Sequence, residues 1–139
     1  SGVQYPLSQR HLGCLVRDQA GHHFAHRVTM TTLAITLLPS GTRGIHTTRQ
    51  SLLPAILVEG LTPRVPEDCP DIAAIFCFRD QDAMVDGVVN WLGERFPEDE
   101  ALVSLELDLS GLAAVATCEW ELAVTAPVPP SRILTWSVI

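Results

Sequence analysis

The sequence contains no lysine. Its nine positive charges are all arginines, set against 16 aspartates and glutamates, so the formal net charge is −7. The missing lysine excludes a P-loop lysine, a Schiff-base lysine and a lysine general base. The acidic balance does not favour a duplex nucleic-acid partner, because proteins of that class usually carry a basic face. A local group of arginines can still hold an anionic ligand.

Long apolar runs and closely spaced cysteines are also missing. No run reaches the ~20 residues needed to cross a bilayer, and no basic stretch followed by an apolar one predicts a signal peptide. We therefore expect no membrane partner and a cytoplasmic location, with delivery as an effector as the alternative. None of the four cysteines forms a C-x-x-C pair, so free thiols are expected. His22 and His26 would share one helix face, but the sequence around them predicts a turn and a strand, and we expect no metal.

The remaining composition is that of one globular domain, with 47% hydrophobic and 18% charged residues in 139 positions. Alternation and β-branched residues predict strands at 11–18, 26–38, 43–48, 72–78, 101–109, 119–124 and 132–139.

Two helices are expected between these strands. The first covers 52–60, with Ser51 as N-cap and Gly60 as its stop. The second follows Asp80 or Asp82, either of which can cap it. Its apolar residues recur at helical spacing and predict one buried face: Met84, Val88, Trp91, Leu92 and Phe96. The class is therefore α+β with a largely antiparallel sheet.

Several short motifs follow one another in a recognisable order. Ile45-His46-Thr47-Thr48 ends a strand and leads into a helix that reaches Leu61. A "TPR" loop, an apolar strand, a helix containing tryptophan and the strand "LVSLELDL" come next, and Glu121 then opens "LAVTAPVPPSRI". This order resembles the ADP-ribosyltransferase fold of small bacterial, toxin-like mono-ADP-ribosyltransferases and the related RNA 2′-phosphotransferases. Isoleucine stands where that family usually has an aromatic residue before the histidine.

The resemblance implies a mostly antiparallel split sheet with two or three short helices. It covers 43–139 as the core of a single domain, 1–139, and leaves 1–42 as an extra segment, a candidate sheet edge, protein-binding segment or substrate-recognition part. It also implies NAD as the substrate and transfer of ADP-ribose to a protein, nucleic-acid or small acceptor. A non-catalytic binding module and an NAD-dependent RNA 2′-phosphotransferase are the alternatives. A basic rim of Arg43, Arg49 and Arg64 would favour the phosphotransferase.

The chemistry of NAD cleavage indicates what such a site needs. Breaking the nicotinamide–ribose bond passes through an oxocarbenium-like sugar, which a nearby carboxylate stabilises. The resemblance assigns that role to Glu121 and ribose binding to His46, with Thr47 and Thr48 beside it. Glu119 would serve the acceptor, on the assumption that it shares a strand face with Glu121.

Other cofactor contacts are less clear in the sequence. The family's middle motif, which stacks on nicotinamide, is not evident, and Phe76 and Phe78 are the candidate ring faces. Arg64 is the arginine of the "TPR" loop and is assigned to the NAD site. Taken alone, His46 also fits a strand-end histidine with a backbone partner. Glu121 alone fits an exposed strand residue paired with an arginine.

Overall fold

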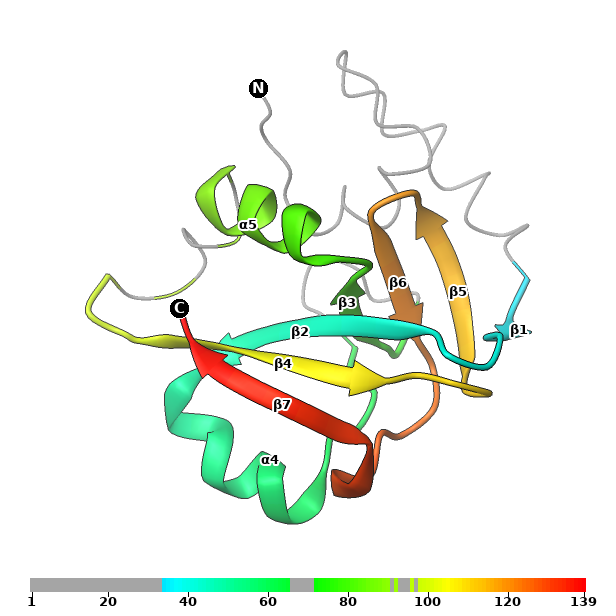
Figure 1. The fold of residues 1–139 in the computed structure, drawn as a ribbon, viewed down its shortest axis with the longest axis horizontal. Helices are drawn as coiled ribbons and strands as arrows, with labels where there is room; N and C mark the ends of the chain where they lie inside the picture. The colour runs from blue at the N-terminus through cyan, green and yellow to red at the C-terminus, as the bar shows by residue number, and fades with distance from the viewer. Residues whose placement is uncertain (1–33, 66–71, 91, 93–95, 97) are drawn as a thin grey trace.

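The computed structural model describes residues 34–65, 72–90, 92, 96 and 98–139 (Figure 1). These residues form an α+β fold with a seven-stranded antiparallel sheet and two α-helices. The strands are β1 (Thr36–Leu37), β2 (Arg43–Arg49), β3 (Ile75–Phe78), β4 (Leu102–Asp108), β5 (Ala113–Cys118), β6 (Glu121–Val124) and β7 (Ile133–Val138). The helices are α4 (Leu53–Glu59) and α5 (Gln81–Asn90), and short 3₁₀ turns cover Gln50–Leu52 and Pro130–Arg132.

The strands are ordered β1-β5-β6-β3-β2-β4-β7 across the sheet. Every residue of β2 has a partner on β4, from Arg43 opposite Asp108 to Arg49 opposite Leu102. On its other edge, β2 meets β3 only where Ile45 lies opposite Phe78. In Figure 1, β5 and β6 run steeply across the direction of β2, β4 and β7. The sheet therefore opens between β2 and β3.

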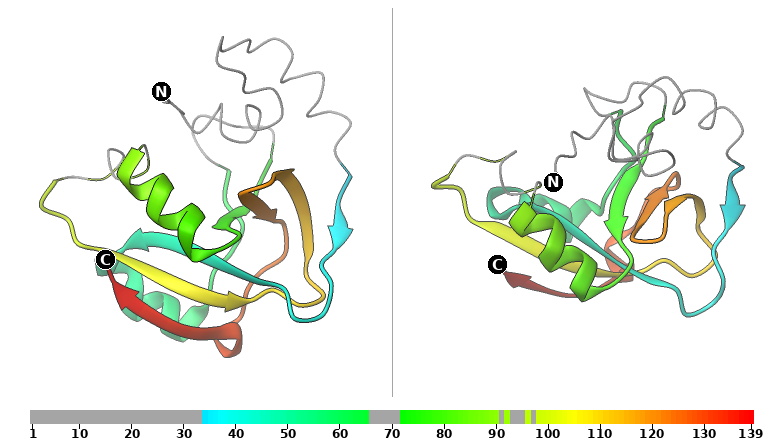
Figure 2. Two further views of the ribbon diagram at one scale, coloured as in Figure 1. Left: turned by 45° about the horizontal axis from the view of Figure 1, so that its top comes forward. Right: turned by 90° about the horizontal axis from the view of Figure 1, so that it is seen from above.

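The two helices lie on opposite sides of β2 (Figures 1 and 2). α4 contributes Leu53 and Ile56 to the main core, which also holds Leu105 of β4. α5 contributes Met84 to a smaller core around Phe78, and Ile45 packs against that core. β2 lies between the two helices, and its Ile45 packs on the α5 side.

The expected alternation of the strand at 101–109 is confirmed. Val103, Leu105, Leu107 and Leu109 are all 0% exposed. On the other face, residues 102, 106 and 108 are only partly buried, whereas Ser104 is buried. Burial of one apolar row is the main stabilising contribution expected of a half-buried strand.

The predicted helix boundaries are correct at two of three places. α4 stops at Gly60, whose φ of +81° favours glycine and whose position leaves no room for a side chain against the Val128 carbonyl. α5 starts after Asp80, whose Oδ1 accepts a hydrogen bond of 2.8 Å from the Ala83 amide. Ser51 is not an N-cap: the chain enters α4 through a 3₁₀ turn, and the Ser51 hydroxyl donates to Glu100 instead.

Several strand predictions also need correction. The strand expected at 72–78 begins at Ile75, and of the strand expected at 26–38 the described residues form only Thr36–Leu37. The strand expected at 119–124 begins at Glu121, because residues 119 and 120 form the turn after β5. β5 itself was not expected, since its alanines carry no strand signal. β1 pairs with β5, so the start of the described chain forms an edge of the sheet. The predictions for 11–18, for 26–33, for Trp91 and for His22 and His26 lie outside the described residues.

Candidate functional site

A cavity of about 450 Å³ lies where β2 and β3 part. Its volume falls within the range of small-molecule sites. Most of its wall comes from β2, α4, β3 and the residues that directly follow α4, and Leu92, Phe96 and Glu121 also line it.

Most of the predicted site residues meet at this cavity. The predicted residues that line the cavity are His46, Thr47, Thr48, Arg64, Phe76, Phe78 and Glu121. Glu119 is the exception: it is exposed, lies in the turn between β5 and β6, and is not part of the cavity wall. The assumption that Glu119 and Glu121 share a strand face is therefore wrong.

His46 bridges the gap between the two strands. Its Nδ1 lies 2.9 Å from the carbonyl oxygen of Phe76 on β3. A carbonyl oxygen can only accept, so the ring donates its Nδ1 proton, and in the neutral ring Nε2 is then an acceptor. A backbone partner for His46 was one of the two interpretations of this residue. His46 has that partner and also lines the cavity.

Glu121 is a buried carboxylate at the start of β6. Its exposed fraction is 2%, so the interpretation of Glu121 as an exposed strand residue is wrong. Its Oε1 accepts a hydrogen bond of 2.9 Å from the Thr117 hydroxyl on β5. Strand register pairs Glu121 with Phe78, and Phe78 with Ile45. Glu121 therefore lies on the Ile45 side of the sheet and His46 on the other side, and both are among the residues that line the cavity.

Thr47 and Thr48 differ in their surroundings. Thr47 is 7% exposed, and its Oγ1 has no hydrogen-bond partner among the described residues. Thr48 is half-buried. A buried hydroxyl without a partner costs about 1–3 kcal/mol, so Thr47 is a place where a ligand would recover lost hydrogen bonding.

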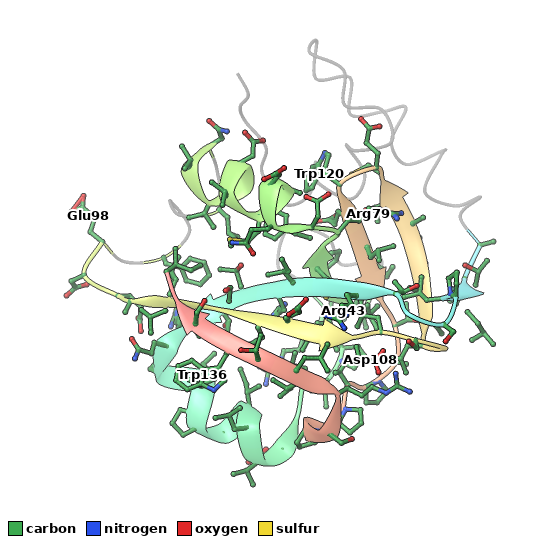
Figure 3. The ribbon with its side chains drawn as sticks, viewed as in Figure 1. Arg43, Arg79, Glu98, Asp108, Trp120 and Trp136 are labelled. Carbon is green, nitrogen blue, oxygen red and sulfur yellow. The ribbon has the colours of Figure 1, made fainter. Side chains whose placement is uncertain are left out.

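The two phenylalanines also differ. Phe78 belongs to the small core and stacks on Trp120, with ring centroids 6.2 Å apart and planes at 28°. Phe76 is only partly buried. Figure 3 shows Trp120 near Arg79, beside the start of α5. The Arg79 amide donates to the Trp120 carbonyl (3.0 Å), and its Nε donates to the Cys118 carbonyl (3.2 Å), so the turn that carries Trp120 is tied to the end of β3.

The cavity wall carries ionisable groups of both signs, with Glu121 and Arg64 among them. Burial raises the pKa of the Cys77 thiol, and the charge of Glu121 raises it further, so Cys77 is an inert thiol rather than a nucleophile. Of the three arginines expected to form a basic rim, only Arg64 lines the cavity. Arg43 pairs with Glu106 at 3.3 Å. Arg49 lies 4.0 Å from Glu100 and over the ring of Phe96.

Thr117 was missed by the sequence analysis. It is 1% exposed and contacts Glu121 directly. No motif marks it, and the strand that carries it was not expected. A threonine four positions before the carboxylate is the one feature that points to it, and this becomes informative only when the turn between the two strands is known.

The described part of the chain holds no group of three His, Cys, Asp or Glu side chains placed to bind one metal ion. Neither helix within it has the length and apolar character needed to cross a membrane. A scan against protein-family models and a search of curated proteins find no match to this chain.

Proposed function

We propose that the chain is an NAD-dependent mono-ADP-ribosyltransferase that transfers ADP-ribose from NAD to an acceptor and releases nicotinamide. One observation carries the proposal: His46 and Glu121, from distant parts of the sequence, line one cavity at the opening between β2 and β3. The sequence motifs named these two residues as the ribose-binding and charge-stabilising groups. The opening is the feature that a split sheet requires, and it supports the ADP-ribosyltransferase-like fold as part of the proposal.

The residues suit the steps of such a reaction. The bond between nicotinamide nitrogen and ribose C1′ breaks, and its electron pair leaves with neutral nicotinamide. Positive charge then develops on the sugar, where the carboxylate of Glu121 stabilises it. His46, held by the Phe76 carbonyl, presents a ring of fixed orientation to a ribose hydroxyl. An acceptor nucleophile forms the new bond to C1′ and loses its proton.

The cavity wall also suits the leaving group. The rings of Phe76 and Phe78 both line the cavity, and the partly buried Phe76 is the one that would lie against the nicotinamide. Arg64 supplies positive charge for the diphosphate. Glu119 lies outside the cavity, two residues from Glu121, which suits a role toward the acceptor rather than toward NAD.

Neither alternative function gains an observation of its own. A basic rim of Arg43, Arg49 and Arg64 would have favoured the phosphotransferase, and only Arg64 of the three lines the cavity. A filled cleft would have favoured a binding module, and the described residues leave a cavity of about 450 Å³.

The test is incubation with NAD labelled in the adenylate half, following nicotinamide release and the label on protein or nucleic acid. Glu121→Gln keeps the shape and removes the charge. Its release rate should fall by about 10²–10³-fold, the cost of losing one transition-state electrostatic contact, while NAD affinity changes little.

Glu119→Gln is the matched control, an exposed carboxylate outside the cavity. It should leave nicotinamide release nearly unchanged and reduce transfer to the acceptor. If the wild-type protein binds NAD but never releases nicotinamide, the chain is a binding module. If Glu119→Gln abolishes release and Glu121→Gln does not, the two carboxylates have been assigned in reverse.

A further inference from the structure

The two edge strands of the described sheet differ in length and in protection. β1 at one edge has two residues, Thr36–Leu37, whereas β7 at the other edge has six, Ile133–Val138. Natural edge strands are usually short, or carry charges, prolines or bulges that prevent a further strand from pairing with them. β7 has no charged residue and no proline, and its one register shift lies before Thr135. The part of β7 that follows Thr135 is therefore an unprotected edge.

The pairing of β7 with β4 shows which of its backbone groups point outward. The Ile139 amide donates to the Leu102 carbonyl at 2.9 Å, so Ile139 turns its backbone groups toward β4. In an antiparallel pair, such inward residues alternate with outward ones. Trp136 and Val138 therefore direct their amides and carbonyls away from β4, where the described part of the chain places no strand. A further strand could bond to these outward groups.

The side chains of the same two residues are apolar and exposed. Trp136 lies opposite Leu105, a core residue beside α4, so it belongs to the α4 face of the sheet (Figure 3). Val138 lies two residues further on and shares this face. The exposed fractions of Trp136 and Val138 are 44% and 51%. Ser137 between them lies on the opposite face, with its hydroxyl 3.3 Å from that of Ser104.

We propose that β7 pairs antiparallel with β7 of a second copy of this chain, with the two-fold axis at Ser137. In this register Trp136 of each copy lies opposite Val138 of the other, and their outward amides and carbonyls bond to one another. Aromatic and β-branched side chains make favourable cross-strand pairs. The two Ser137 residues meet at the axis, where opposite Cα atoms are only about 4.5 Å apart and small side chains fit.

The charges around β7 favour a second copy over a strand of another protein. Two copies of a chain with net charge −7 repel one another wherever their acidic residues meet. The chain has no charged residue from Ile133 to Ile139, and Arg132 just before them donates to the Asp108 and Ser110 carbonyls. β7 can therefore approach its own copy without bringing like charges together. A different partner would be selected by complementary charge, which this edge lacks.

Sedimentation velocity of the chain without NAD, between about 1 and 200 µM, tests the pairing, because a contact of this size is weak and depends on concentration. We expect a reversible change from monomer to dimer in this range. Val138→Glu places a carboxylate against Trp136 of the other copy and should weaken dimerisation at least about tenfold. Leu37→Glu is the matched control, because it adds the same charge at an exposed residue of the opposite edge strand. It should change the dimer dissociation constant by less than about twofold.

Val138→Pro is a second variant that adds no charge. It removes one outward amide hydrogen at an edge position that tolerates proline, and it should also weaken the dimer about tenfold. Thermal unfolding shows which variants fold, and Val138→Pro decides if Val138→Glu does not. A wild-type chain that stays monomeric, or that forms ever larger species, overturns the proposal. A dimer that resists the Val138 variants, or that Leu37→Glu weakens as much as Val138→Glu does, overturns it too. None of these measurements involves nicotinamide release, so the proposed function is tested separately.

Discussion

The two edges of β2 are built in opposite ways. Along β4 the strand is paired at every residue, from Arg43 to Arg49. Along β3 it is paired once, at Ile45 and Phe78. Gly44 lies beside that single contact, and a side chain there would press on Leu109 and Cys77. One strand therefore closes the sheet on one side and opens it on the other.

Polar groups on the closed edge of β2, along β4, are satisfied differently from those on the open edge, along β3. On the closed edge, backbone groups satisfy one another above a core of fully buried leucines. On the open edge, the Phe76 carbonyl is bonded by the ring of His46 instead of by a strand amide. The hydroxyl of Thr47 has no partner among the described residues. The polar groups that a ligand can use thus gather where backbone pairing stops.

If the closed edge carries the stability, the largest effect should come from its core. Leu107 is 0% exposed and lies opposite Gly44. Leu107→Ala should lower the free energy of unfolding by about 2–5 kcal/mol, through lost burial and the cavity left behind. Chemical denaturation measures it.

Leu134→Ala on β7 is the control, because Leu134 is 45% exposed. It should change the free energy of unfolding by no more than about 0.5 kcal/mol, as expected of surface substitutions. Similar losses for the two leucines would contradict the division between a stabilising closed edge and the rest of the sheet.

The open edge should instead show its effect on binding. His46→Ala should weaken NAD binding by about 1–2 kcal/mol, the cost of one lost hydrogen bond to a polar ligand group. Titration calorimetry on wild type and variant measures this. The control is Arg43→Ala, at the far end of the same strand and outside the cavity wall. If both variants bind NAD as wild type does, His46 is only the partner of the Phe76 carbonyl.

The same contrast explains which parts of the fold were predictable. The row of leucines in β4 alternates in the sequence because one face is buried, and Gly60 and Asp80 mark helix ends through local backbone chemistry. These signals need no knowledge of the rest of the chain. Ser51 failed as a cap because the 3₁₀ turn before Pro54 moved the helix start, an effect that depends on how β2 leads into α4.

The site was predictable only in part, for a related reason. His46 and Glu121 lie in motifs whose order resembles a known family, so their meeting could be expected. Thr117 lies on β5, whose β-branched residues are only Val115 and Thr117 among alanines, a pattern too short to predict a strand. Its pairing with β1 and β6 decides its conformation. Contacts that depend on such non-local pairing leave no mark in a single sequence.

The smallest and most specific prediction concerns Thr47. Thr47→Val removes a buried hydroxyl that has no partner among the described residues and keeps the side chain's shape. The free energy of unfolding should therefore rise by about 1 kcal/mol. NAD binding should weaken by about 1 kcal/mol, roughly fivefold, because the hydroxyl would be satisfied by the ligand.

The half-buried Thr48 is the control, since Thr48→Val should not raise the free energy of unfolding. Changes of opposite sign in the two measurements identify a group kept for a ligand at the expense of folding. If the Thr47→Val variant is more stable and binds NAD as tightly as wild type, the Thr47 hydroxyl has no role in binding NAD. His46, Glu121 and Arg64 would then be the polar groups of the cavity wall proposed to contact NAD.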